Sequence, residues 1–167
     1  MPETEHNNSA TALSARQVLT FHLGSELYGI DILQVQEIRG WSPVTRIVQS
    51  PPHMLGVLNL RGSVVPIIDL RKRFELASAE FSPLTVIIVL SLTAAGGKRE
   101  CGVVVDSVSD VFDVKPDSIR PAPNSGDTVR SRFVEGLITL DERMLILLDT
   151  VELVAGDLRI PALVAAA

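Results

Sequence analysis

Few side chains in this sequence have the type and spacing that metal or nucleophilic chemistry requires. The three histidines, His6, His22 and His53, lack the spacing of metal ligands, and Cys101 has no histidine close to it in the sequence. A zinc site would need several such ligands at short intervals. The sequence also contains no GxGxxG loop, no P-loop and no GxSxG nucleophile elbow. The residues therefore predict no metal, no cofactor and no enzymatic activity.

Two aspartates, Asp69 and Asp149, could be imagined as a catalytic pair. Each stands at the step from an apolar, strand-like run to a short helical segment. A side-chain oxygen at such a step satisfies backbone N–H groups of the first helical turn. Asp149 is followed three residues later by Glu152, a spacing that resembles a capping box. We therefore interpret both aspartates as helix N-caps.

Arg61 is the strongest candidate for recognition, because it stands at the tip of a predicted hairpin over residues 56–70. Its planar fork of N–H donors suits carbonyl or carboxylate partners. Two interpretations stay open: Arg61 contacts a partner, or it pairs with a neighbouring acid and locks the turn. Further along, Arg71 begins a charged connector. We interpret this connector as a solvated helical turn after the Asp69 cap, with a binding patch as the alternative.

The elements that must position these residues occur twice. Residues 56–70 align with 136–150 at a constant offset of 80 residues, and 28–38 align with 101–111 at an offset of 73. Two repeats in the same order indicate an internal duplication of a small β module. Short strands with tight turns suit a small closed barrel, which has no exposed edges. The residues predict a mainly β fold of two such five-stranded barrels, with short helices.

Three irregular points interrupt the strand pattern. Residues 33–38 cannot continue the preceding alternation, so we expect a helical turn or a bulge that leaves Val35 and Glu37 near the rim. Trp41 lies in a stretch interrupted by prolines. We favour the interpretation that its side chain packs into the core over the interpretation that it contacts a partner. Pro66 has no backbone N–H to donate to a neighbouring strand, which indicates a sheet edge or a bulge at this position.

Composition narrows the classes of function. The net charge is −5 and the pI about 5.2, which argues against binding to nucleic acid or to an anionic membrane surface. A single cysteine excludes an internal disulfide and suggests a reducing compartment. No apolar run approaches the roughly 20 residues of a membrane span, and the N-terminus does not resemble a signal peptide. We expect a cytoplasmic protein without direct membrane insertion.

Five blocks follow one another in a recognisable order: FHLGSELYGIDILQVQEIRG, GVLNLRGSVVPIIDLRKRF, CGVVVDSVSDV, RPAP and GLITLDERMLILLD. The turn NLRG followed by VVPIIDL is the most specific of them. From about Val18 to about Leu153, these blocks resemble CheW, the family of coupling adaptors in bacterial chemotaxis. Its close relatives are the regulatory domain of the kinase CheA and the CheW half of CheV.

The resemblance implies two SH3-like five-stranded barrels joined by an apolar interface, and no enzymatic activity. It implies a chain, monomeric in isolation, that is recruited to membrane-associated chemoreceptor arrays. It implies one contact with the hairpin tip of methyl-accepting chemoreceptors and another with the regulatory domain of the histidine kinase CheA. The motif match assigns these receptor-binding residues: Val35, Glu37, Gly56, Asn59 and Arg61. The kinase-binding residues expected in the first barrel are Trp41, Val44, Arg46 and Ile47.

The expected domain organisation is a flexible tail (1–17), a CheW-like domain (18–153) and a C-terminal tail (154–167). Within the domain we expect the first barrel to span 18–83 and the second to span 84–153. Two alternative functions stay open. One is coupling in a non-chemotaxis array that controls pili or a second messenger. The other is a small ligand-binding β-barrel, which would require a sizeable apolar pocket with convergent polar groups.

Overall fold

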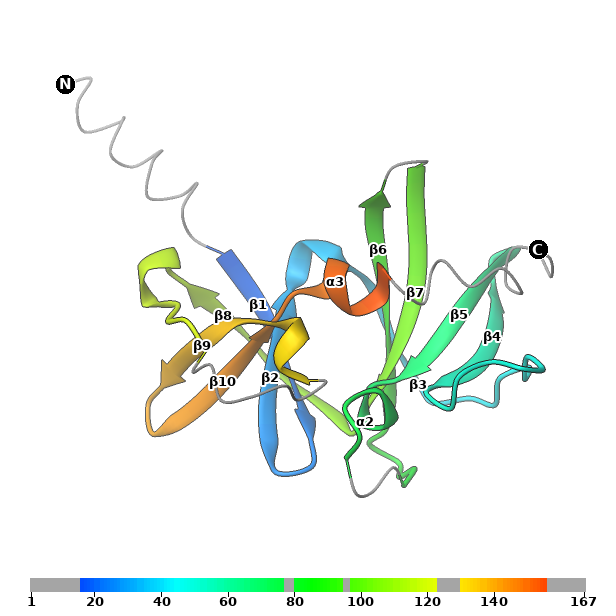
Figure 1. Ribbon diagram of the computed structural model, residues 1–167, viewed down its shortest axis with the longest axis horizontal. Helices are drawn as coiled ribbons and strands as arrows, with labels where there is room; N and C mark the ends of the chain where they lie inside the picture. Colours follow the sequence, from blue (N-terminus) through cyan, green and yellow to red (C-terminus); the bar gives the residue numbers. More distant parts are fainter. Residues whose placement is uncertain (1–15, 77–79, 95–96, 123–129, 156–167) are drawn as a thin grey trace.

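The computed structural model describes residues 16–76, 80–94, 97–122 and 130–155, and within them the chain is mainly β (Figure 1). This confirms the predicted fold class. The strands are β1 (Arg16–Leu23), β2 (Glu26–Asp31), β3 (Val35–Gly40), β4 (Met54–Leu60), β5 (Ser63–Asp69), β6 (Val86–Ala94), β7 (Gly97–Val105), β8 (Ser107–Val114), β9 (Val134–Leu140) and β10 (Arg143–Leu148). The helical segments are η1 (Ile32–Gln34), α2 (Leu70–Arg73), η2 (Pro116–Ser118), η3 (Arg130–Phe133) and α3 (Thr150–Ala155).

The strands form two five-stranded sheets that lie side by side (Figure 1). One sheet, which we call barrel A, has the order β8-β1-β2-β10-β9, and the other, barrel B, has the order β3-β6-β7-β5-β4. Isolated backbone bridges join Thr45 to Val57 and Arg120 to Leu137. Thr45 follows one edge strand of barrel B, and Val57 lies in the opposite edge strand. The bridge therefore closes the sheet, and the second bridge does the same for barrel A.

The predicted division into barrels of residues 18–83 and 84–153 is wrong. That boundary separates the two repeats, which are β1–β5 and β6–β10. However, barrel A combines β1 and β2 with β8, β9 and β10, and barrel B combines β6 and β7 with β3, β4 and β5. Each repeat therefore contributes its first two strands to one barrel and its last three strands to the other.

This strand exchange begins where the second strand of each repeat ends. After β2, the 3-10 turn η1 redirects the chain, and the Asp31 carboxylate caps it by accepting a hydrogen bond from Leu33 N at 3.0 Å. Strand β3 then pairs with β6, with a register shift between Val35 and Glu37. The predicted helical turn and bulge are thus both present. In the second repeat only Asp106 separates β7 from β8, and β8 pairs with β1.

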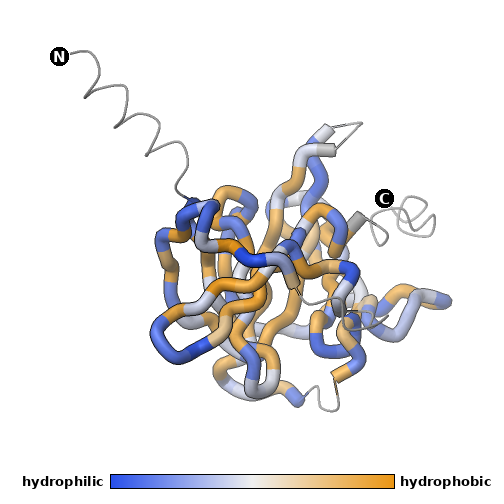
Figure 2. The backbone as a smooth tube through the Cα atoms, turned by 60° about the vertical axis from the view of Figure 1, so that its left-hand side comes forward, coloured by the Kyte–Doolittle hydropathy of each residue, from blue (hydrophilic) through white to orange (hydrophobic). Residues whose placement is uncertain are grey.

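The apolar side chains form three clusters. One lies inside barrel A and includes Val18 and Leu145, and a second lies inside barrel B and includes Val65 and Ile87. The third and largest, which we call the seam, draws buried side chains from strands of both barrels. Figure 2 shows hydrophobic stretches along the strands through the middle of the molecule, and hydrophilic ones mainly at turns. The seam confirms the apolar interface that the resemblance implied.

Stacked aromatic rings cross the seam. Phe21 and Tyr28 of barrel A stack at 5.9 Å between ring centroids, and Tyr28 stacks on Phe74 at 5.7 Å. Phe74 directly follows α2 of barrel B and stacks in turn on Phe133 of η3 at 6.1 Å. Offset aromatic pairs of this kind contribute beyond the area that they bury. They tie the helical turns of both repeats to the sheets.

Both predicted N-caps are confirmed. The Asp69 carboxylate accepts a hydrogen bond from Arg71 N at 3.0 Å, and the Asp149 carboxylate accepts one from Glu152 N at 3.2 Å. These contacts satisfy backbone donors at the starts of α2 and α3. The two aspartates serve the fold, as the repeat position indicated.

The expected exposure of Arg71 is wrong: Arg71 is fully buried, so neither a solvated turn nor an exposed binding patch describes it. For Pro66, the expected sheet edge is wrong, because β5 pairs with β4 on one side and with β7 on the other. The alternative, a bulge, has a counterpart next to Pro66, because the register of β4 against β5 shifts between Met54 and Gly56. Pairing with β7 runs from Ile67 onward, so the missing N–H of Pro66 falls just outside that ladder.

The ends of the domain also differ from the expected bounds. Strand β1 already begins at Arg16, and α3 continues through Val154, which is buried. The rest of the expected N-terminal and C-terminal tails lies outside the described residues. Among the residues that the structure describes, no helix is long and apolar enough to span a membrane.

Gly56 occupies a position that no other residue fits without displacement of the backbone. Its φ is +152°, and a Cβ there would lie 2.1 Å from the Thr45 carbonyl oxygen. Gly136, the equivalent in barrel A, would place a Cβ 2.8 Å from the Arg120 carbonyl oxygen. The bridges that close both barrels therefore pass directly over these two glycines.

We predict that Gly56→Ala destabilises the protein by about 1–3 kcal/mol or more, because the added methyl group overpacks against backbone. Gly40→Ala is the matched control, since a Cβ at Gly40 meets no atom within 4 Å. Its effect should stay within about 0.5 kcal/mol. Urea unfolding monitored by circular dichroism measures both. Equal midpoints for Gly56→Ala and the unsubstituted protein would contradict this account of barrel closure.

The strand exchange predicts that neither repeat folds alone. If the chain is cut after Ser78, each half retains strands whose partners lie on the other half. We expect each half alone to lack cooperative unfolding, and an equimolar mixture to recover it. Circular dichroism and NMR spectra of the separate and mixed halves measure this. A monomeric half that unfolds cooperatively by itself would show that the exchange is not required.

Candidate partner-binding surfaces

The turn between β4 and β5 presents Arg61 at one end of barrel B. Leu60 pairs with Ser63, so the loop contains only Arg61 and Gly62. Their φ values are +53° and +85°, as a type I′ hairpin turn requires. The Asn59 side-chain oxygen accepts a hydrogen bond from Gly62 N at 3.0 Å. Asn59 therefore stabilises the turn that carries Arg61.

Arg61 reaches across the barrel to the edge strand β3. Its guanidinium Nη2 lies 3.3 Å from the Glu37 carboxylate Oε2, with 68% of the Arg61 side chain and 24% of the Glu37 side chain exposed. The interpretation that Arg61 pairs with a neighbouring acid is therefore correct for this geometry. The pair also leaves most of the guanidinium open to solvent, so recognition by Arg61 is compatible with it.

The structure brings four of the five expected receptor-binding residues to this end of barrel B. Val35 is half-buried and packs against the seam, and Glu37 follows it on β3. Asn59 and Arg61 are exposed. We call Val35, Glu37, Asn59 and Arg61 the rim. Gly56 is buried beneath Thr45, so it supports the closed barrel and is not itself on the surface.

The four expected kinase-binding residues lie together at the opposite end of barrel B. They line one cleft of about 470 Å³ beside the loop between β3 and β4. Trp41 and Val44 pack against the apolar cluster of barrel B, whereas Arg46 is exposed and Ile47 half-buried. Further residues that line the cleft are Pro43, Gln49, Ser50, Pro51, Pro52, Met54, Leu55, Lys72 and Phe81. Trp41 thus packs against the core of barrel B and also forms part of the cleft surface.

Phe81 is one of the cleft residues that sequence reasoning missed. Its ring stacks on Trp41 at 4.3 Å between centroids, with an interplanar angle of 21°. The available signal was its residue type, since aromatic residues make up only 4% of the chain. Its partner Trp41 lies 40 positions earlier, so spacing could not reveal the pair.

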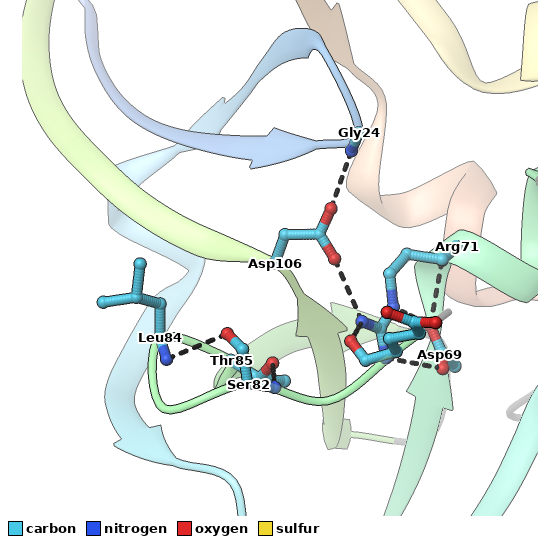
Figure 3. A network of polar contacts seen from close by, with 8 residues as sticks. Gly24, Asp69, Arg71, Ser82, Leu84, Thr85 and Asp106 are labelled. Carbon is cyan, nitrogen blue, oxygen red and sulfur yellow. Dashed lines mark hydrogen bonds and ion pairs between the residues drawn. The ribbon is translucent and has the colours of Figure 1, made fainter. Parts of the chain in front are cut away.

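A network of polar contacts surrounds Arg71 (Figure 3), whose guanidinium carbon lies 5.0 Å from the centroid of the Phe81 ring. Arg71 donates from Nε to Asp69 Oδ1 at 2.9 Å and from Nη2 to Asp69 Oδ2 at 3.0 Å. It also donates from Nη1 to Asp106 Oδ1 at 3.0 Å, and Asp106 Oδ2 accepts from Gly24 N at 2.7 Å. Burial alone lowers the pKa of Arg71, but Asp69 and then Asp106 outweigh it and raise that pKa above its ordinary value.

In the part of the chain that the structure describes, no group of three or more His, Cys, Asp or Glu side chains could hold a metal ion. Apolar clusters of described residues occupy the interiors of both barrels, as expected for small barrels. This packing does not favour the ligand-binding alternative.

The comparisons with known proteins agree with this geometry. The family model of the CheW-like domain matches residues 17–157. The chemotaxis protein CheW of Klebsiella aerogenes is 48% identical over 142 residues, covering 85% of this chain and 83% of the relative. The CheW of Bacillus subtilis is 31% identical, covering 84% and 88%. The crystal structure of the scaffolding protein TtCheW from Thermoanaerobacter tengcongensis superposes with a TM-score of 0.70 at 34% identity, covering 80% of this chain and 83% of that one.

These matches span nearly all of the described chain, and the structural match has the same fold. Proteins of this family are scaffolds and adaptors, generally without catalytic activity. They act together with chemoreceptors and the kinase CheA. From the two barrels, the two surfaces and these relatives we conclude that the chain belongs to the CheW-like family of chemotaxis coupling proteins.

Proposed function

We propose that this chain is a non-catalytic adaptor that binds the hairpin tip of chemoreceptors and the regulatory domain of CheA at the same time. The observation that carries this proposal is the position of the two surfaces at opposite ends of barrel B. Strand β4 begins at Met54, which lines the cleft, and ends at the turn that carries Arg61. Two partners can therefore bind one barrel without competing for the same residues.

The rim suits the receptor. It combines a half-buried apolar side chain, Val35, with the partly open ion pair of Arg61 and Glu37. A helical tip could place an apolar side chain against Val35 and a carboxylate or carbonyl oxygen against Arg61. Such a charge at the edge of an interface adds specificity and raises the association rate.

The cleft suits the kinase domain. Trp41 and Phe81 form an aromatic wall, and Arg46 and Lys72 add positive charge beside it. Aromatic residues and arginine are enriched among residues that dominate binding energy at protein interfaces. The chain would then work in the cytoplasm, recruited to membrane-associated arrays by its two partners. Each contact would be modest alone and would gain strength from multivalency in the array.

Reversal of the rim charge should weaken receptor binding selectively. We expect Arg61→Glu to weaken binding of a receptor hairpin-tip fragment by about tenfold or more, because a partner-facing charge is inverted. Loss of the exposed ion pair should cost less than about 1 kcal/mol of stability. Titration calorimetry with the receptor fragment and with the kinase regulatory domain measures both affinities.

Asp141→Arg is the control for this variant, because Asp141 occupies the equivalent turn of barrel A with the same φ of +53°. It should leave receptor binding unchanged. The double variant Glu37→Arg, Arg61→Glu restores the internal ion pair with its two charges exchanged. If it binds the receptor normally, the pair only locks the turn, and direct recognition by Arg61 is excluded.

Reversal of charge in the cleft should have the opposite selectivity. We expect Arg46→Glu to weaken binding of the kinase regulatory domain by about fivefold to tenfold, and to leave receptor binding unchanged. Arg99→Glu, an equal charge change on the exposed part of β7, is the control. The same titrations measure the effect. Equal loss in both arginine variants would indicate a general electrostatic effect instead of a cleft contact.

A further inference from the structure

The segment Glu80–Thr85, which carries Phe81, belongs to no helix or strand. Its contacts with itself are local: Ser82 N donates to Thr85 Oγ1 at 2.8 Å, and Leu84 N donates to Ser82 Oγ at 3.1 Å (Figure 3). One backbone bond, from Trp41 N to Thr85 O at 3.2 Å, ties its end to the start of the cleft loop. These bonds fix residues 82–85 but leave Phe81 to be held by something else.

Arg71 supplies that support. Its Nη1 donates to the Glu80 carbonyl oxygen at 2.6 Å, and its guanidinium carbon lies 5.0 Å from the centroid of the Phe81 ring. Arg71 therefore contacts the segment on both sides of the Glu80–Phe81 peptide bond. Cation–π contacts of this kind orient an aromatic ring as well as stabilise it.

The guanidinium can act as a fixed support because its other donors are occupied. Both oxygens of Asp69 accept from it, and Asp106, between β7 and β8, accepts from Nη1. Asp69 and Arg71 are fully buried. A planar fork whose donors are bound in this way cannot rotate without the loss of several charge-assisted hydrogen bonds.

The second repeat shows that the helix cap does not require the arginine. Asp149 caps α3 as Asp69 caps α2, yet the residue equivalent to Arg71 is Val151, which is 48% exposed. The capped turn after the last strand therefore forms without a buried guanidinium. Beyond the Asp69 cap, the polar and ring contacts of Arg71 are with Asp106 and with the segment carrying Phe81.

We propose that Arg71 is a positioning residue for the cleft: it holds Phe81 against Trp41 and thereby builds the aromatic wall that the partner meets. What the wall binds rests on the proposed function, but the wall itself does not. Trp41 is the single tryptophan of the chain, so its fluorescence reports the wall without any partner.

The first test is the emission and acrylamide quenching of Trp41 in Arg71→Lys, which keeps the charge and loses the fork. We expect its Trp41 to become more accessible to acrylamide, approaching the accessibility found in Phe81→Leu, where the stacked ring is removed outright. Leu84→Ala is the matched control, because Leu84 is an exposed apolar side chain of the same segment without a ring contact. A folded Arg71→Lys with unchanged Trp41 quenching would overturn the proposal.

The second test separates the wall from the proposed function. Kinase-domain binding should fall about tenfold in both Arg71→Lys and Phe81→Leu, while receptor-fragment binding stays unchanged. A merely structural role of Arg71 would weaken both partners together, and that result would overturn the positioning role. If the unsubstituted protein binds no kinase domain, the proposed function fails, and the fluorescence result still decides the wall.

A third measurement covers the case in which Arg71→Lys does not fold. In the unsubstituted protein the Arg71 Nε–H should exchange slowly with solvent and should change its NMR frequency in Phe81→Leu, because the ring lies over the guanidinium. Leu84→Ala should leave this resonance in place. A resonance that does not respond to loss of the Phe81 ring would contradict the contact on which the proposal depends.

Discussion

The exchange of strands between the two repeats is the constraint on which the rest of this structure depends. No turn folds β3 back on β2, so β3 completes a sheet begun by β6 and β7 of the other repeat. The seam then buries side chains of both repeats in one cluster. As a consequence, the rim and the cleft of barrel B rest on both halves of the chain. All rim and cleft residues belong to the first repeat, but barrel B that presents them is complete only with β6 and β7 of the second repeat.

The buried ion pairs of Arg71 add direction to this nonpolar framework. Hydrophobic contact across the seam favours many relative positions of the barrels almost equally, because it is not directional. The link from Arg71 through Asp106 to Gly24 connects α2 of barrel B with the β1–β2 turn of barrel A at fixed distances. A buried ion pair contributes little net stability after the cost of desolvation. Its contribution here is a defined position for the β1–β2 turn and for the segment that forms the cleft wall.

Local features of this fold were predictable from the sequence, and long-range ones were not. Glycines and polar turns mark the hairpins, and Asp69 and Asp149 mark their caps, because these signals act within a few residues. The partner of β3 is chosen by apolar strands more than 40 positions away, which leaves no local trace. For the same reason the sequence around Arg71 suggested an exposed cation, although Asp106, 35 positions later, pairs with Arg71 in the interior. The motif match singled out Arg61 at its turn, whereas the Trp41–Phe81 pair depended on tertiary contact.

The duplication provides an internal comparison that locates the specialised surfaces. The backbone is repeated closely: Arg61 and Asp141 share a φ of +53°, and Ile38 and Val111 are exposed to similar extents. The side chains that distinguish barrel B are not repeated. Where barrel B pairs Arg61 with Glu37, barrel A carries Asp141 and Asp110, two acidic residues that cannot form an ion pair with each other. Where barrel B buries Arg71, barrel A exposes Val151. Since the fold accommodates both sets of side chains on one backbone plan, a barrel of this kind can form without arginines at the positions of Arg61 and Arg71.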